Sequence, residues 1–117
     1  MDVRLKRVYE TVAPDDGYRV LVDRLWPRGV SKERAALDLW LKEAAPSPEL
    51  RTEWHAHPER WDEFSAAYRA ELATNPAVET LAGFAAQHPR LTLLYGAHDP
   101  ERNHAVILLE AVRASAD

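Results

Sequence analysis

Residues 18–29 constrain the fold of this 117-residue chain more than any other segment. An apolar run from Tyr18 to Val22 ends abruptly at Asp23, and charged and aromatic residues follow as far as Gly29. A strand that is apolar along its length is typical of a sheet buried on both faces, as in α/β proteins. Polar residues directly after such a strand lie where α/β proteins bind ligands. The segment therefore predicts a buried strand that ends in a ligand site.

The rest of the chain predicts more strands and a set of helices. Residues 5–9 and 91–95 are expected to be strands. The connector before Tyr18 is too short for a helical crossover, so the first two strands are either antiparallel or not adjacent. A helix is expected over residues 31–44, and others should start at prolines, which fit the first helical position. These prolines are Pro48, Pro58, Pro76 and Pro100.

The element order gives the expected architecture. We expect a single α/β domain over residues 1–117, with a small mixed sheet of about three or four strands flanked by about five helices. The strands at 18–22 and 91–95 should lie side by side at its centre and run parallel. Their carboxyl ends would then open on the same edge of the sheet.

Composition excludes several functional classes. The chain has no cysteine, which removes disulfides, thiolate metal sites and cysteine nucleophiles. Its four glycines form neither a nucleotide-binding loop nor a serine-nucleophile elbow. No apolar stretch is long enough to span a membrane and the N-terminus lacks a signal-peptide pattern, so no membrane association and a cytoplasmic location are expected.

The charge is unevenly distributed along the chain. The net charge is −4, yet residues 1–34 contain eight basic and six acidic side chains. This modest basic excess around the first central strand favours a small anionic metabolite as partner and makes nucleic acid an unlikely one. The pattern leaves the cofactor and the oligomeric state open.

Eight residues after the two central strands have side chains suited to ligand binding or proton transfer: Asp23, Arg24, Trp26, Arg28, Tyr95, Asp99, Asn103 and His104. Asp23 and His104 are the candidate catalytic groups, because a carboxylate and an imidazole can transfer protons near neutral pH. The other six are candidate ligand-binding residues, and either Arg24 or Arg28 could grip a phosphate or carboxylate with two hydrogen bonds. The last helix should also begin nearby and favour an anion.

Each candidate also has a structural interpretation. Arg24 could pair with Asp23 or Asp99, and Trp26 could pack in the core. Tyr95 could be a buried, hydrogen-bonded tyrosine, and His104 a satisfied side chain at a helix start. The aromatic residues Trp54 and Phe64 are most simply explained as core.

Several motifs along the chain resemble those of one family. These are residues 22–29 (VDRLWPRG), 39–41 (LWL) with 45–47 (APS), 58–64 (PERWDEF), 68–72 (YRAEL), and 91–95 (LTLLY) with 103–105 (NHA). Together they resemble the DUF488 family, in its short YeaO-like branch, over nearly the whole chain. The resemblance implies a compact α/β domain of unknown function, and it assigns no reaction and no residue role.

Three functional hypotheses follow. The first is a small anionic ligand, bearing phosphate or carboxylate, bound at the carboxyl edge of the central strands, with catalysis open. The second is a metal-dependent enzyme that uses histidines among His55, His57, His98 and His104, although no metal site is assigned from their spacing. The third is a non-catalytic module that presents Trp26 to a protein partner, which requires an exposed apolar patch.

Overall fold

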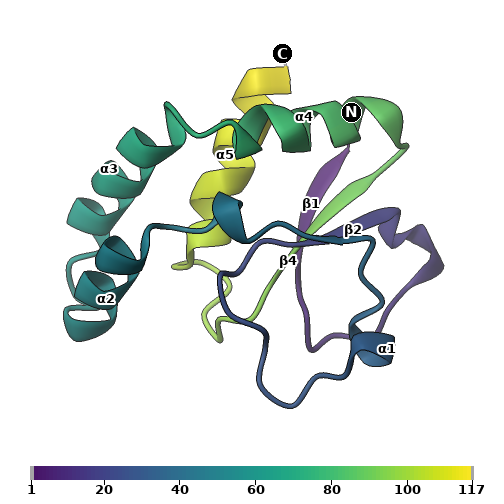
Figure 1. The fold of residues 1–117 in the computed structure, drawn as a ribbon, viewed down its shortest axis with the longest axis horizontal. Helices are drawn as coiled ribbons and strands as arrows, with labels where there is room; N and C mark the ends of the chain where they lie inside the picture. Colours follow the sequence, from purple (N-terminus) through teal and green to yellow (C-terminus); the bar gives the residue numbers. More distant parts are fainter. Residues whose placement is uncertain (1, 117) are drawn as a thin grey trace.

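The computed structural model describes residues 2–116, which form a four-stranded parallel sheet and five α-helices (Figure 1). The strands are β1 (Val3–Arg7), β2 (Tyr18–Leu21), β3 (Leu39–Trp40) and β4 (Leu91–Tyr95). The helices are α1 (Lys32–Ala35), α2 (Pro48–Ala56), α3 (Trp61–Leu72), α4 (Ala77–Gln87) and α5 (His104–Ala116). Two short 3-10 turns, Pro14–Asp16 and Lys42–Ala44, complete the order.

The strand order is β1-β4-β2-β3, so β2 and β4 lie at the centre as predicted. They run parallel, with Val20 opposite Leu93. β1 and β2 are not adjacent, because β4 lies between them. The fold class is therefore confirmed. The described strands all pair in parallel, whereas a mixed sheet was expected.

The parallel arrangement requires residues 8–17 to return the chain from the end of β1 to the start of β2. They do so without an α-helix, through an irregular segment and the turn Pro14–Asp16. An extended segment of this length reaches roughly 30 Å, at about 3.3 Å per residue, which exceeds the length of a five-residue strand. A short connector therefore suffices for strands that are not neighbours.

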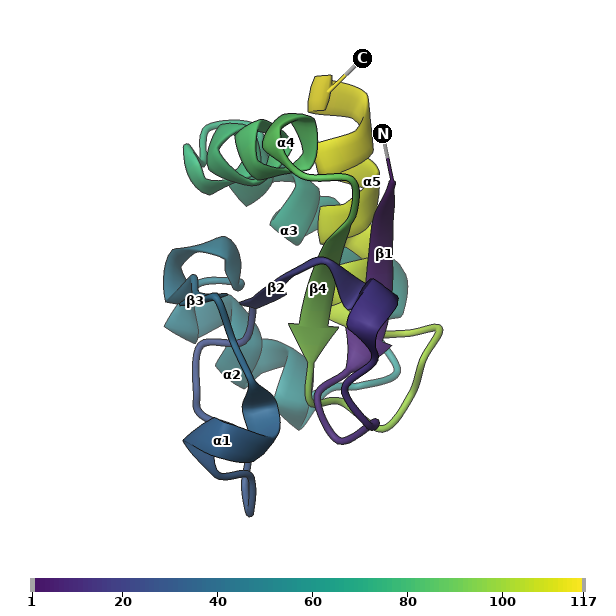
Figure 2. The same cartoon turned by 90° about the vertical axis from the view of Figure 1, so that its right-hand side faces the viewer.

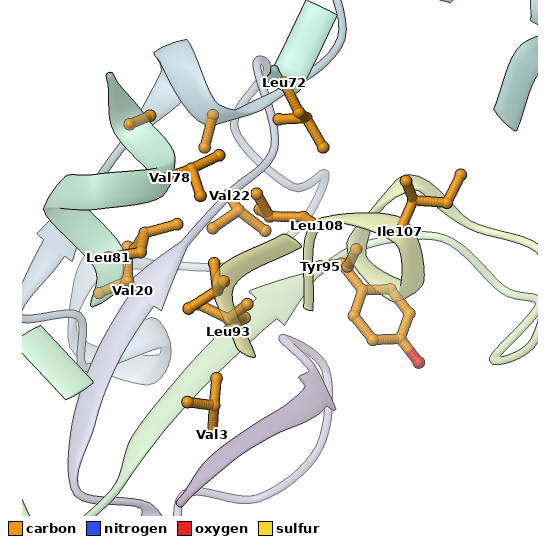
Figure 3. Packing of buried hydrophobic residues seen from close by; sticks show 14 of the residues in the cluster. Val3, Val20, Val22, Leu72, Val78, Leu81, Leu93, Tyr95, Ile107 and Leu108 are labelled. Carbon is orange, nitrogen blue, oxygen red and sulfur yellow. The ribbon is translucent and has the colours of Figure 1, made fainter. Parts of the chain in front are cut away.

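The core lies mainly between the sheet and helices α3, α4 and α5 (Figure 3). Val20 and Leu93 of the central strands face this layer, and α5 runs alongside β1 and β4 (Figure 2). Leu21 and Leu94 face the other way, into a smaller cluster. Because both faces are buried, the central strands read as nearly continuous apolar runs, each broken once, by Arg19 in β2 and by Thr92 in β4.

The prediction of a helix over residues 31–44 is wrong. α1 ends after one turn, because Ala36 adopts a left-handed conformation with φ of 47°. The chain then forms the edge strand β3 beside β2. Buried Arg19 holds this path: its guanidinium donates to the carbonyls of Ala35 and Ala36, and it pairs with Asp16.

One helix begins at the proline predicted from the sequence, and others begin a few residues after it. α2 begins at Pro48, as expected, and Ser47 caps it by accepting the Leu50 N–H. α3 begins at Trp61 rather than Pro58, and α5 begins at His104 rather than Pro100. Neither His57 nor Asp99 caps these helices, and Asn103 accepts the Val106 N–H at the start of α5 instead.

Candidate functional site

A cavity of about 230 Å³ lies where β2 and β4 end, beneath α2 and beside the start of α5. Its polar lining residues are Asp23, Arg24, Arg51, His55 and His104. Its apolar lining residues are Leu25, Ala45, Pro46, Trp54, Phe64 and Ala97. We call it the strand-edge cavity. It occupies the position at which open α/β sheets bind ligands.

Asp23 lies at the inner end of the strand-edge cavity. Its Oδ2 accepts the Gly96 N–H at 2.9 Å, and its Oδ1 lies 3.4 Å from Nε2 of His104. Oδ1 is buried and accepts no hydrogen bond within residues 2–116. Burial raises the pKa of Asp23, while the charge of His104, the Gly96 N–H and the charge of Arg51 act in the opposite direction. Asp23 therefore gains a proton more readily than an exposed aspartate.

Gly96 is needed for this contact. A Cβ placed on Gly96 would lie 3.0 Å from Oδ2 of Asp23, a tight contact that would require the carboxylate to shift. A glycine directly after a central strand can also let a ligand approach the backbone closely. In the structure it is the Asp23 carboxylate that makes the close approach.

His104 is the first residue of α5 and is held in one orientation. Its Nε2 lies 3.0 Å from the carbonyl oxygen of Val22, and a carbonyl only accepts, so Nε2 carries the hydrogen. Burial lowers the pKa of His104, although Asp23 and Val22 oppose the shift. Nδ1 of the neutral ring is therefore an acceptor that can take a proton.

The two arginines of the strand-edge cavity differ in what they contact. Arg24 donates from Nε to the Pro46 carbonyl at 3.2 Å and from Nη2 to the Ala45 carbonyl at 3.4 Å. Arg51, on α2, takes part in no ion pair within the described part of the chain. Arg24 is likewise absent from the ion pairs of these residues, but its donors are partly used by carbonyls, so Arg51 is the guanidinium that can present two N–H groups to an anion.

An aromatic wall closes one side of the strand-edge cavity. Trp54 stacks on Phe64 with ring centroids 4.2 Å apart. The indole N–H of Trp54 is buried and has no acceptor in residues 2–116. Leu25 lies at the rim and is 57% exposed. These groups offer a surface for an apolar ligand body.

The position of α2 depends on contacts with α3. Ser47 donates from N and from Oγ to the Glu71 carboxylate, at 2.9 and 2.6 Å. The Tyr68 hydroxyl donates to the Ala44 carbonyl. No side chain of α2 is buried, so these contacts before its first turn largely fix where Arg51 and Trp54 lie.

Of the predicted residues, Asp23, Arg24 and His104 come together in the strand-edge cavity. Trp26 lies on the other face of the sheet, where its ring meets Trp40 edge-on at 5.3 Å. The Arg28 side chain is exposed, and its carbonyl accepts the Tyr9 hydroxyl.

The other three predicted residues also lie outside the strand-edge cavity lining. Tyr95 is buried, with its ring beside α5 (Figure 3). Asp99 accepts the N–H groups of Glu101 and Arg102, and Asn103 caps α5. The protein's own side chains thus bind N–H groups that were expected to face an anion.

Sequence reasoning missed Arg51 and interpreted Trp54 and Phe64 as core only. A signal was present: Arg51, Trp54 and His55 are spaced i, i+3 and i+4, which places them on one face of α2. A face with one cation, one indole and one imidazole is typical of a helix that borders a site. Without the position of α2, nothing linked this face to Asp23.

Other parts of the molecule fit a site less well. A larger cavity of about 460 Å³ lies between α3, α4 and α5, but its Arg69 and Glu110 pair with each other at 3.4 Å. In residues 2–116 no three His, Asp or Glu side chains converge as metal ligands, so nothing supports the histidine metal site. Across the same residues the only large exposed hydrophobic side chains are Val12 and Leu25, which form no contiguous patch for a partner.

None of the helices in residues 2–116 has the length and apolar character needed to cross a membrane.

Several bacterial proteins are similar in sequence to this chain over nearly its full length. The chain is 45% identical over 115 residues to the uncharacterized protein YeaO of Escherichia coli K12, covering 97% of this chain and 99% of YeaO. It is 42% identical over 108 residues to the uncharacterized proteins Mb3100c of Mycobacterium bovis and Rv3073c of Mycobacterium tuberculosis H37Rv, covering 92% of this chain and 91% of each relative. No solved structure matches the chain significantly. A family model described as the inactive DUF488-N3 subclade matches residues 2–117, and the chain therefore belongs to the DUF488 family.

Proposed function

We propose that this protein binds a small anionic ligand in the strand-edge cavity. The observation that carries the proposal is Arg51, a half-buried guanidinium that lines this cavity and takes part in no ion pair in the described residues. A guanidinium of this kind can form a two-pronged hydrogen bond with a carboxylate or phosphate. The location at the ends of two central parallel strands supports the same proposal.

A thermal-shift screen with inorganic phosphate, acetate and benzoate tests the proposal. We expect at least one anion to raise the melting temperature of the wild type, because binding to the folded state stabilises it. Arg51→Gln should abolish the shift. Arg28→Gln is the matched control, because Arg28 is exposed and does not line this cavity, so it should respond as the wild type does. No shift with any anion, or an equal shift in Arg51→Gln, contradicts the proposal.

Proton transfer by Asp23 and His104 is a second candidate function. It is favoured by the fixed hydrogen on Nε2 of His104, which orients the imidazole and frees Nδ1 as a base. The description of the matching subclade as inactive favours binding over turnover. If the protein only binds its ligand, NMR should show the ligand unchanged after days of incubation with the protein. Proton exchange or chemical conversion of the ligand that requires the protein, and that is lost in His104→Gln, would support catalysis.

A cytoplasmic location, one domain over residues 1–117 and the absence of a nucleic-acid partner stay predictions from the sequence. The net charge of −4 supports the last of these, because nucleic-acid-binding domains generally carry a strongly basic face.

A further inference from the structure

We infer that the ligand of the strand-edge cavity is a monoanionic organic acid, a single carboxylate on a compact apolar body, rather than a phosphate ester. This inference rests on the proposed function and specifies which anion the same site selects. Three features carry it: the number of available cations, the negative charge beside them, and the size and apolar character of the wall.

The available positive charge matches one carboxylate. Arg24 already donates to the carbonyls of Ala45 and Pro46, which leaves Arg51 as the guanidinium without an internal partner among the lining residues in 2–116. One guanidinium binds one carboxylate through two parallel hydrogen bonds. Arg24 keeps its charge beside the carbonyls, but the negative charge of Asp23 offsets one of the two arginine charges. His55 is exposed at the rim, and burial lowers the pKa of His104.

The negative charge of Asp23 opposes a second negative charge on the ligand. Asp23 and Arg51 line the same cavity, and the charge of Arg51 acts on Asp23. A phosphate monoester carries roughly −1.5 to −2 at neutral pH, so part of its charge would face a carboxylate in a poorly solvated space. With Arg24 and Arg51 positive and Asp23 negative, one bound carboxylate leaves these lining groups with no net charge.

The wall and the volume favour a small apolar body. Trp54 and Phe64 present stacked rings, and Leu25 lies exposed at the rim. The cavity measures about 230 Å³. This is less than the roughly 300–1,000 Å³ of sites that enclose drug-sized ligands, and it equals about seven or eight water molecules. One ring with a carboxylate fits this space, whereas a nucleotide would extend well outside it.

Calorimetric titration with four probes at about pH 8 and constant ionic strength tests the inference. Benzoate carries both features, acetate only the carboxylate, benzyl alcohol only the ring, and phenyl phosphate the ring with a more highly charged anion. We expect benzoate to bind at least about tenfold more tightly than each of the other three. In Arg51→Gln, benzoate should bind no more tightly than benzyl alcohol. In Arg28→Gln, benzoate should still bind more tightly than benzyl alcohol. Circular dichroism of each variant confirms that it is folded.

The outcomes separate this inference from the proposed function. If phenyl phosphate binds as tightly as benzoate and loses affinity in Arg51→Gln, the monoanion inference is wrong and anion binding stands. If acetate binds as tightly as benzoate, the inference that the ligand has an apolar body is wrong. If no probe binds, or if benzyl alcohol binds as tightly as benzoate, the proposed anion binding is wrong as well.

Asp23→Asn tests the source of the selectivity. The asparagine keeps an oxygen that can accept the Gly96 N–H, but it has no charge. We expect the affinity ratio of benzoate to phenyl phosphate to fall severalfold in this variant, because the repulsion of the second negative charge is removed. An unchanged ratio in a folded variant contradicts the role given to Asp23.

Discussion

At the scale of single residues, the site is organised around Asp23. Its carboxylate is oriented by Gly96 and faces His104, and Arg51 shares the cavity with it. The close approach of Asp23 explains the glycine at position 96, and the Val22 carbonyl fixes the tautomer of the buried His104 imidazole beside it. Asp23 therefore sets both the shape and the charge of the strand-edge cavity.

Anion binding should depend on pH through Asp23. The groups that face it are His104 from α5, Arg51 from α2 and the buried Tyr68 from α3, whose pKa burial raises above its usual value. Burial raises the pKa of Asp23 and lowers that of His104, and lowering the pH removes the negative charge of Asp23 and adds a positive charge on His104. Both changes favour an anion. Benzoate affinity should rise between pH 8 and about pH 5, where benzoate is still ionised.

Titration calorimetry over this range checks the sign of the pH effect. In Asp23→Asn the profile should be flatter, because the carboxylate that titrates is gone. Affinity that falls as the pH is lowered, with the protein still folded, would show that the charge of Asp23 does not oppose the ligand.

Gly96→Ala should destabilise the fold by about 1–3 kcal/mol, because the added Cβ would press on Oδ2 of Asp23, whose carboxylate is held by the Gly96 N–H. The control is Gly83→Ala within α4, where an added Cβ meets nothing within 4 Å. Removing a helical glycine there should stabilise the fold by up to about 1 kcal/mol. Urea denaturation measures both changes, and equal effects in the two variants would rule out the close contact.

At the scale of elements, α2 is the part of the site that sequence could not place. The strands at β2 and β4 follow from apolar runs, and the start of α2 follows from Ser47 and Pro48. The orientation of α2 depends on Glu71, which lies 24 residues beyond Ser47. A local pattern contains no information on such a contact, and Arg51 was missed for this reason.

A similar long-range effect explains the wrong helix at residues 31–44. The segment has reasonable helix-forming residues, but Arg19 binds the carbonyls that would continue α1. Tertiary contacts with a buried cation outweigh local propensity here. The position of Trp26 outside the strand-edge cavity has a related cause, because an aromatic residue after a strand can turn to either face of the sheet.

Ser47→Ala should weaken both stability and ligand binding. The hydroxyl accepts the Leu50 N–H and donates to Glu71, so its loss costs about 1 kcal/mol and loosens the start of α2. Ser31→Ala is the control, since Ser31 caps α1 through the Arg34 N–H away from the strand-edge cavity. Both variants should lose stability in urea, but only Ser47→Ala should lose benzoate affinity. Equal benzoate affinities in the two variants would contradict the positioning role of Ser47.

At the scale of the whole molecule, the parallel sheet makes the site. β2 and β4 are about 70 positions apart in sequence, yet their parallel pairing brings Asp23 next to Gly96 and His104. This juxtaposition was predictable, because two nearly continuous apolar runs in one small domain tend to pair centrally. The molecule also contains a larger cavity between α3, α4 and α5, so the location of binding is the central question.

Amide and indole chemical-shift mapping during a benzoate titration answers it most directly. We predict that the largest chemical-shift changes fall on Asp23, Gly96, Ala97 and the Trp54 indole. The signal of the Trp26 indole, which donates to the Val30 carbonyl on the other face of the sheet, should stay unchanged. Changes that gather instead on Val78, Glu79 and Ala111 would place the ligand between the helices and contradict the strand-edge site.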